Sequence, residues 1–358
     1  MSVGRPLRIV AYTDSAAVGG AEHALAHLVT ALDDSFEVSV LGVSETVVSL
    51  VAGPRPTSLV SRPRPIPADT RSFGEHLRAL RALRPDVLHA NLISPFSCQY
   101  GISAAIALGI PSVAVYQLPN TPANRLQRLL KLLTARLTSA HVGVGERTAR
   151  EIEALVGLSP GKVRTIHNGV PDLPIARTGH RAGNGATIGA VGRLAHQKGL
   201  DVLLRALVHL PAARVVLAGR GEEEGPLREL AGRLGVADRV SFPGWVDEPR
   251  RLLSSFDVFA LPSRFEGFPL AVLEAQLAEL PVVAADVGSV ADAVLSGQTG
   301  ILVPPNDPHA LAVALESLLS DPDRSTELGR AGRERVLSRF TASHMAAAFE
   351  RLYAEIVA

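Results

Sequence analysis

Short runs of strand-forming residues alternate with amphipathic helical patterns along the whole chain. In the first half, strands are predicted at 7–12, 37–42, 86–90, 112–116, 140–144 and 163–166, with helical patterns such as 21–32, 73–83 and 125–137 between them. In the second half, strands are predicted at 187–191, 214–218, 239–242, 257–261, 281–284 and 300–303. Strands that alternate with helices form parallel sheets with right-handed crossovers. The chain is therefore predicted to be an α/β protein.

The alternation is broken once, at residues 171–185, which contain prolines and glycines but few apolar residues. Such a composition is typical of a linker, and 358 residues are enough for two domains of moderate size. We predict Rossmann-like domains at 1–172 and 186–340, followed by an amphipathic helix over 341–358. Because open α/β sheets bind ligands at their carboxyl edges, a ligand held between the two domains is expected.

Composition excludes several classes of protein. Apolar residues make up 47% of the chain and aromatic residues only 4%, so both cores are expected to be aliphatic. With 36 basic and 35 acidic residues, no overall field favours nucleic acid. The single cysteine, Cys98, permits no intrachain disulfide. The N-terminal residues lack the pattern of a signal peptide, and the longest apolar region, 87–116, is interrupted by polar residues and prolines. A cytoplasmic protein is expected.

The most informative motif runs from Ser263 to Ala275 and directly follows the predicted strand 257–261. Gly267 permits a tight turn, and Pro269 suits the first turn of a helix. A helix N-terminus is therefore expected here, with backbone N–H groups and the positive end of its dipole available for an anion.

Two glutamates of this motif, Glu266 and Glu274, lie eight residues apart. Along a helix this spacing corresponds to a rise of about 12 Å, whereas the carboxylates of glycosidases lie roughly 5–9.5 Å apart. The spacing favours hydrogen bonds to two separated sugar hydroxyls over hydrolysis. A solvated helix with a capping glutamate is the structural alternative.

Two glycine-containing loops also follow predicted strands. The segment from Gly192 to Gly199 carries Arg193 and Lys198, which can bind a diphosphate through a planar fork and a point charge; a solvated basic loop is the alternative. Gly19 and Gly20 allow the backbone to approach a ligand at another strand-to-helix turn.

Two weaker patterns do not predict a ligand-binding site. Gly219, Gly221 and Gly225 do not have the spacing of a dinucleotide-binding fingerprint. The sequence Asp321-Pro322-Asp323 is the only Asp-x-Asp, and we interpret it as a turn or helix N-cap. No metal site is therefore predicted.

Taken in order, these motifs resemble those of the retaining family-4 glycosyltransferases over nearly the whole chain. The resemblance rests on the Gly19-Gly20 loop, Asn168-Gly169-Val170, Gly192-Arg193 with Lys198-Gly199, Gly219-x-Gly221, Gly244-Trp245-Val246, Leu261-Pro262-Ser263, Glu266 with Glu274, and Thr299 to Pro304. It implies a GT-B fold with the active site in the interdomain cleft, and a C-terminal helix (341–358) that packs back on the N-terminal domain.

The resemblance also implies roles. The N-terminal domain would bind the acceptor and the C-terminal domain the nucleotide sugar. Arg193 and Lys198 would neutralise the diphosphate in place of a metal, Glu266 would bind the donor sugar, and Glu274 the ribose. The remaining implied donor contacts are Gly19, Gly20, Gly192, Trp245, Val246, Gly267, Phe268, Pro269 and Leu270.

One position departs from the family. Many members carry a histidine at the end of the strand 112–116, where this chain has Gln117. Glutamine can donate a hydrogen bond but does not titrate. We keep Gln117 as a catalytic candidate and His89, Asn91, Asn120 and Asn168 as candidates for acceptor or cleft contacts; a structural role is the alternative for His89.

Residues 125–137 form a basic amphipathic pattern. It favours either a helix that contacts an anionic lipid surface, at the inner face of the membrane, or a surface helix whose leucines pack on the sheet.

Together, the motifs and the resemblance predict a metal-independent hexosyltransferase without cofactor. It would use a UDP-sugar, or next a GDP-sugar, and an acceptor hydroxyl of a small molecule, glycan or lipid. The alternatives are a catalytically weak sugar-nucleotide-binding partner and a sugar-nucleotide epimerase of similar shape.

Overall fold

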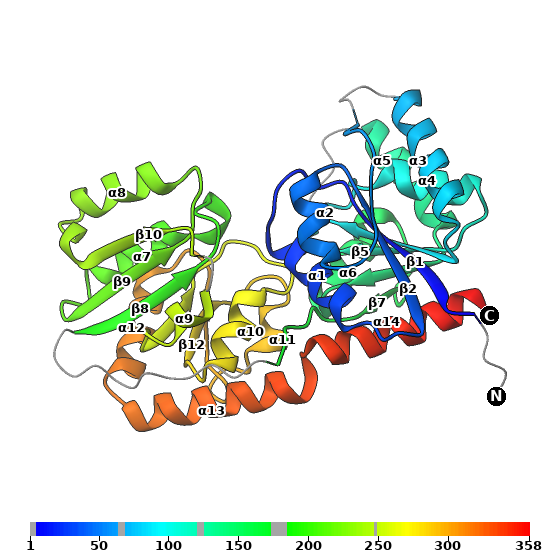
Figure 1. Ribbon diagram of the computed structural model, residues 1–358. Helices are drawn as coiled ribbons and strands as arrows, with labels where there is room; N and C mark the ends of the chain where they lie inside the picture. Colours follow the sequence, from blue (N-terminus) through cyan, green and yellow to red (C-terminus); the bar gives the residue numbers. More distant parts are fainter. Residues whose placement is uncertain (1–4, 64–68, 120–124, 173–184, 247–248) are drawn as a thin grey trace. The chain divides into compact units, whose positions relative to one another are not determined.

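The structure, a computed structural model, describes residues 5–63, 69–119, 125–172, 185–246 and 249–358. The chain divides into two compact units. Unit 1 comprises Met1–Pro171 and Ala342–Ala358, and unit 2 comprises Asp172–Thr341. Each unit is a parallel sheet with helices on both faces (Figure 1).

The sheet of unit 1 has the strand order β3-β2-β1-β4-β5-β6-β7, and every neighbouring pair is parallel. Its strands are β1 (Leu7–Thr13), β2 (Phe36–Gly42), β3 (Thr57–Leu59), β4 (Val87–Leu92), β5 (Ser112–Tyr116), β6 (Ala140–Gly143) and β7 (Val163–Thr165). The chain moves outward from β1 in both directions, so the sheet is doubly wound. All carboxyl ends consequently lie at one edge.

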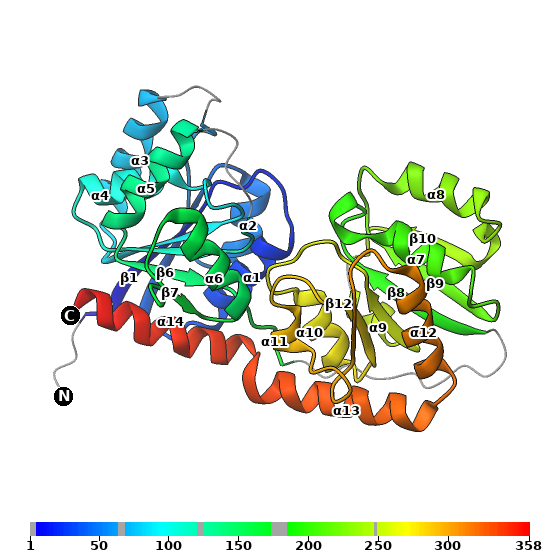
Figure 2. The ribbon, with the colours of Figure 1, turned by 180° about the vertical axis from the view of Figure 1, so that it is seen from behind.

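The helices of unit 1 form two layers (Figures 1 and 2). One layer contains α1 (Gly20–Ala31), α2 (Glu45–Ala52) and α14 (Ala342–Val357). The other contains α3 (Thr70–Leu83), α4 (Gln99–Ala107), α5 (Arg125–Leu137) and α6 (Glu146–Val156). The core beneath the second layer is built mainly from Val, Leu, Ile and Ala.

Helix α14 belongs to unit 1 although it ends the chain. Its first residue, Ala342, donates a backbone hydrogen bond of 2.8 Å to the carbonyl of Val170. Tyr353 is fully buried, and its hydroxyl oxygen lies 2.7 Å from Nδ1 of His89 on β4. Arg164 and Glu355 form an ion pair near the end of the helix. The predicted return of the C-terminal helix to the first domain is confirmed.

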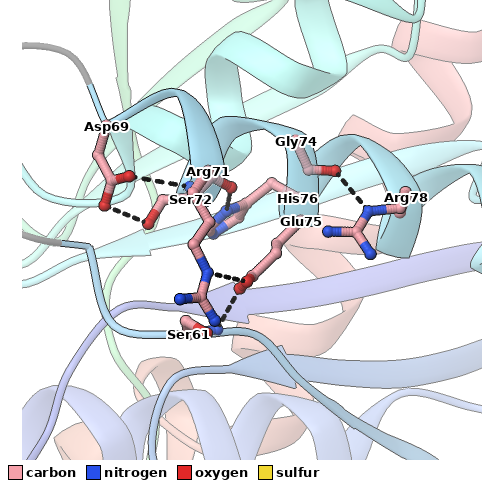
Figure 3. A network of polar contacts seen from close by, with 8 residues as sticks. All are labelled: Ser61, Asp69, Arg71, Ser72, Gly74, Glu75, His76 and Arg78. Atoms are coloured by element: carbon pink, nitrogen blue, oxygen red, sulfur yellow. Dashed lines mark hydrogen bonds and ion pairs between the residues drawn. The ribbon is translucent and has the colours of Figure 1, made fainter.

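Helix α3 begins with a side-chain cap (Figure 3). The Asp69 carboxylate accepts hydrogen bonds from the Ser72 backbone N–H at 3.2 Å and the Ser72 hydroxyl at 2.7 Å, which satisfies a group left unpaired at every helix start. Glu75 accepts from the Ser61 backbone N–H at 2.9 Å and from Arg71 at 3.0 Å. The helix is thereby joined to the chain that follows β3.

The sheet of unit 2 has the order β10-β9-β8-β11-β12-β13 and is also parallel throughout. Its strands are β8 (Ala186–Val191), β9 (Ala213–Ala218), β10 (Val240–Gly244), β11 (Val258–Leu261), β12 (Val282–Ala285) and β13 (Ile301–Val303). Its helices are η1 (His196–Lys198), α7 (Leu200–Leu207), α8 (Glu224–Arg233), η2 (Ala237–Arg239), α9 (Pro249–Leu253), α10 (Leu270–Leu277), α11 (Val290–Ala293), α12 (Pro308–Leu319) and α13 (Pro322–Arg339). Helices α7, α8 and α12 pack together, as do α10 and α13.

Most elements agree with the sequence-based prediction, and the two-domain α/β fold is confirmed. The exceptions are α2 and the three-residue edge strand β3, which lie in a proline-rich stretch without a readable period. Asp321 is confirmed as an N-cap, since its carboxylate accepts from the Arg324 N–H at 3.0 Å. Among the described residues, no helix is long and apolar enough to cross a membrane.

Candidate active site

The two charged motifs of unit 2 meet because β8 and β11 are neighbours in the sheet. The loop after β8 carries Lys198 and the loop after β11 carries Glu266, both at the carboxyl edge. The Lys198 Nζ lies 2.6 Å from Glu266 Oε1, and the Ser263 hydroxyl donates to the same oxygen at 2.7 Å. The Glu266 side chain is only 6% exposed. This buried carboxylate therefore has a cation and a hydroxyl as partners.

A second set of contacts holds these two loops together. Arg264 makes a bidentate ion pair with Asp201 at 2.8 and 2.9 Å and also donates to the carbonyl of His196 at 2.9 Å. Its backbone N–H donates to the carbonyl of Gln197, and the Gln197 side chain donates to the carbonyl of Phe265. Because a bidentate pair restricts orientation as well as distance, these contacts limit movement of Lys198 relative to Glu266.

Gly199 is required by both conformation and space. It has a φ of +60°, and a Cβ at this position would lie 2.1 Å from the carbonyl oxygen of Pro262. A larger residue would therefore push the Lys198 loop away from the loop after β11.

We expect Gly199→Ala to lower the free energy of unfolding by roughly 3 kcal/mol or more, through overpacking combined with backbone strain. Gly235→Ala is the matched control, because Gly235 has a φ of +68° and a Cβ added there would have no atom within 4 Å; strain alone costs about 1 kcal/mol. Chemical denaturation of both variants measures the difference. Equal losses would mean that the contact with Pro262 is unimportant.

Arg193 lies at the mouth of the same site. A small pocket there is lined by Gly192, Arg193, Lys198 and Pro262, among others. The Arg193 side chain is 67% exposed and pairs with Glu222 at 3.3 Å. An exposed pair of this kind contributes little stability, so Arg193 can exchange Glu222 for an anionic ligand at small cost.

Gly219 explains why a glycine motif stands beside this pocket. A Cβ on Gly219 would lie 1.9 Å from the carbonyl oxygen of Gly192. The Gly219-x-Gly221 motif therefore permits close packing of two loops, which agrees with a spacing that does not match a dinucleotide-binding fingerprint.

The predicted helix N-terminus is present, one residue later than the sequence indicated. Helix α10 begins at Leu270, with Pro269 as its N-cap rather than in its first turn. Glu274 lies inside the helix, as predicted. The Phe268 ring packs 5.1 Å from that of Phe340, and Gly267 accepts a backbone hydrogen bond from Ser289. Helix α10 thus directs its first N–H groups toward the edge that carries Glu266.

Trp245 and Val246 follow β10 at the same carboxyl edge of the sheet. Trp245 is 57% exposed, which is unusual for so large an apolar side chain. Its position is compatible with the predicted contact to the donor.

Unit 1 brings together another group of candidates. Gly19 is the N-cap of α1, and Gly20 is its first residue. The side chains of Asn91, Gln117 and Asn168 are nearly buried and joined by hydrogen bonds of 2.8 and 2.9 Å. They come from the ends of β4, β5 and β7, which the sheet order places at one edge.

His89 does not fit the predicted acceptor contact. It is 1% exposed, hydrogen-bonded to Tyr353, and packed 5.0 Å from the Phe349 ring of α14. Burial lowers its pKa to about 3, so the ring is neutral. Residues 89 and 91 point to the same face of β4, but His89 contacts Tyr353 and Phe349 of α14, whereas Asn91 donates to the Ala21 carbonyl. The role of His89 is therefore packing, the structural alternative. Asn120 lies outside the described residues.

Sequence reasoning missed Ser263, Arg264 and Asp201 as supporting residues. Ser263 and Arg264 stand inside the recognised motif, so their proximity to Glu266 was a usable signal. Asp201 gave none, because its partner is 63 positions away in sequence.

In comparisons with known proteins, each of the two units is matched by its own family model. The family described as "Glycosyltransferase Family 4" matches residues 18–172, and "Glycosyl transferases group 1" matches residues 176–335. The glycogen synthase of Mycobacterium tuberculosis H37Rv is 34% identical over 211 residues, 57% of this chain and 51% of that protein. The D-inositol 3-phosphate glycosyltransferase of Mycolicibacterium gilvum is 39% identical over 194 residues, 49% of this chain and 44% of that protein. The matches thus span about half the length of these curated relatives.

Solved structures agree on the fold. Anabaena Alr3699/HepE in complex with UDP has a TM-score of 0.86 at 20% identity, over 98% of this chain and 100% of that one. The lipopolysaccharide outer core galactosyltransferase WaaB has a TM-score of 0.76 at 17% identity, over 97% and 99%. With the N-terminal unit matched by the family-4 model, the C-terminal unit by the group 1 model, and both units by solved structures of this fold, the chain belongs to the family-4 glycosyltransferases of GT-B fold.

Proposed function

We propose that this chain is a retaining, metal-independent glycosyltransferase that moves a hexose from a nucleotide sugar to an acceptor hydroxyl. The observation that carries the proposal is the 2.6 Å contact between Lys198 and Glu266 beside the N-terminus of α10. A cation, helix N–H groups and a carboxylate at one edge suit a ligand with both phosphates and hydroxyls.

In the proposed reaction, the bond between the sugar and the diphosphate breaks and negative charge grows on the leaving phosphate. Lys198, Arg193 and the first N–H groups of α10 stabilise that charge as it develops. The leaving phosphate takes the proton of the acceptor hydroxyl, and the acceptor oxygen forms the new bond to the anomeric carbon on the same face of the sugar, so the anomeric configuration is retained. Glu266 holds hydroxyls of the donor sugar, and Glu274 those of the ribose.

UDP is the favoured nucleotide of the proposed donor, with GDP next. Supporting this choice, structures of similar fold were solved with UDP and with UDP-glucose. The acceptor is proposed only as a hydroxyl of a small molecule, glycan or lipid. A cytoplasmic location and a site shared by the two units stay predictions.

A thermal-shift series with UDP, GDP, ADP, TDP and their common sugars, each with and without EDTA, tests the proposal. A ligand that binds the native state alone raises the melting temperature by mass action. We expect one nucleotide to raise it equally in the presence of EDTA. A rise that EDTA removes would contradict the metal-free site, and no rise with any nucleotide would contradict the donor assignment.

Measuring nucleotide release with and without acceptor distinguishes the proposed transferase from two other functions. A catalytically weak partner subunit, which Gln117 in place of histidine favours, would bind nucleotide without releasing it from the sugar. An epimerase would convert the donor without needing an acceptor. A transferase releases nucleotide faster when the acceptor is present.

We also propose a weak peripheral membrane contact through α5. Leu133 and Leu137 of this helix are 52% and 64% exposed, and Arg136 beside them is exposed too. Lys131, by contrast, is 1% exposed and lies 4.9 Å above the Tyr116 ring. This orientation is the opposite of a helix that packs those leucines on the sheet, and apolar side chains flanked by arginine suit an anionic lipid surface.

Sedimentation with phosphatidylserine-containing vesicles tests this contact. We expect binding at low salt that weakens as salt rises. Affinity should fall about 30-fold or more in Leu133→Ser/Leu137→Ser, because burial of each exposed leucine contributes roughly 1–2 kcal/mol, or about 2–4 kcal/mol for the pair. Val313→Ser, at a 57% exposed residue of unit 2, should bind like the wild type. Absence of binding at low salt would refute the contact.

A further inference from the structure

Three buried amides in unit 1 form a continuous hydrogen-bonded chain that begins at a backbone carbonyl. Asn91 Nδ2 donates to the Ala21 carbonyl oxygen at 3.0 Å. Gln117 Nε2 donates to Asn91 Oδ1 at 2.8 Å, and Asn168 Nδ2 donates to Gln117 Oε1 at 2.9 Å. Asn91, Gln117 and Asn168 are 1%, 7% and 5% exposed.

The Ala21 carbonyl, at which the series of hydrogen-bonded amides begins, determines the donor and the acceptor in each of these hydrogen bonds. A backbone carbonyl only accepts hydrogen bonds, so the Asn91 atom facing Ala21 must be nitrogen. The other Asn91 atom is then oxygen, and Gln117 must offer nitrogen to it. Gln117 Oε1 consequently faces Asn168, which must donate. A flip of any one amide would place two acceptors or two donors in contact, which is costly for buried groups.

The direction of these hydrogen bonds determines which group of Gln117 remains for a ligand. A primary amide nitrogen carries two hydrogens, and among the described residues Gln117 Nε2 gives one of them to Asn91. Its oxygen accepts a hydrogen bond from Asn168. The second hydrogen of Nε2 therefore gives Gln117 an N–H donor at the carboxyl edge of the sheet, and the amide does not titrate.

We infer that Asn91 and Asn168 are positioning residues that hold Gln117 as a fixed, pH-independent hydrogen-bond donor to an oxygen atom of the bound sugar or acceptor. The inference rests on the proposed function, because it takes the carboxyl edge of unit 1 as a substrate site. It goes beyond that function by assigning Gln117 a direction of hydrogen bonding and by naming the two residues that impose it.

The variant Asn168→Asp tests the direction. It replaces the donor that faces Gln117 with an oxygen, so the buried pair has two acceptors unless the new carboxyl is protonated. With UDP-glucose as the probe, we expect kcat for UDP release to fall about tenfold or more at pH 8, the loss of one buried hydrogen bond, and to recover toward the wild-type value at pH 5. KM for UDP-glucose should change less than kcat. Gln298→Glu, an exposed amide-to-acid change in unit 2, is the control.

A second readout does not depend on activity. The folded Asn168→Asp carboxyl should have a pKa above its unfolded value of about 3.9. A raised carboxyl pKa means that the folded variant binds more protons than the unfolded chain, so its stability is greatest at low pH and is lost as pH rises. The melting temperature of the variant should therefore fall further below that of the wild type at pH 8 than at pH 5.

The outcomes separate the two proposals. A folded Asn168→Asp with wild-type kcat at every pH, or with the same loss at pH 5 and pH 8, would overturn the positioning role. If the wild type itself neither binds nor turns over the nucleotide sugar, the proposed function fails. The inference then falls as a statement about substrate, while the melting temperatures still decide the direction of the amide chain.

Discussion

Replacing Lys198 by alanine is expected to lower kcat by about 10²–10³-fold, the range found when one preorganised donor to a developing negative charge is removed. The Lys198 ammonium is the cation nearest to Glu266 in the described site, at 2.6 Å. Without it, charge on the leaving diphosphate would be stabilised only by Arg193 and helix N–H groups. Affinity for UDP should fall as well, because the diphosphate is present in both UDP and the donor.

This variant also removes a partner from a nearly buried carboxylate, and breaking such a pair can cost several kcal/mol of stability. Lys198→Gln keeps an N–H donor for Glu266 and separates the two effects. Lys162→Ala, at an exposed lysine of unit 1, is the matched control and should behave like the wild type. Wild-type turnover in a folded Lys198→Ala or Lys198→Gln would refute the assigned role.

Glu266→Gln is expected to produce the second largest loss, about 10²-fold in kcat/KM for the nucleotide sugar. A carboxylate accepts charge-assisted hydrogen bonds from sugar hydroxyls, which are stronger than those to a neutral amide. Affinity for UDP alone should change much less, since UDP carries no hexose. The Lys198 variants should weaken binding of both UDP and the UDP-sugar, because both carry the diphosphate. The ratio of UDP to UDP-sugar affinity should therefore rise in Glu266→Gln and stay nearly constant in the Lys198 variants.

Isothermal titration with UDP and UDP-glucose measures this ratio. Glu316→Gln, an exposed glutamate on α12, is the control. Glu266→Ala should lower turnover at least as far as Glu266→Gln, because it also leaves Ser263 without its acceptor. Equal losses of UDP and UDP-glucose affinity in Glu266→Gln would place this residue at the phosphate instead of the sugar.

The order of helices and strands was largely predictable because each element shows its own local hydrophobic pattern. The strands of both sheets are apolar runs bounded by turn residues, and α1, α3, α5 and α14 follow an amphipathic pattern near the predicted positions. The charged motifs were found for a related reason: Lys198 and Glu266 each stand directly after a buried strand, where parallel sheets place ligand-binding residues.

Local pattern failed where the outcome depends on partners that are distant in sequence. His89 looked like a candidate for the substrate site, but Tyr353, 264 residues away, occupies its ring nitrogen. For α5 the sequence left open whether its leucines pack on the sheet or face a lipid surface; in the structure Leu133 and Leu137 are exposed and Lys131 is buried. Neither result can be read from a helix or strand taken alone.

The sequence by itself determined the fold class, the two-domain division and the residue types available at each strand end. Only the tertiary structure decided that Lys198 lies against Glu266, that Arg264 pairs with Asp201, and that three amides point in one direction from the Ala21 carbonyl. The physical reason is that periodicity and turn chemistry act over a few residues. Ion pairs and hydrogen-bond direction depend on which strands become neighbours, and that is settled only when the whole sheet is assembled.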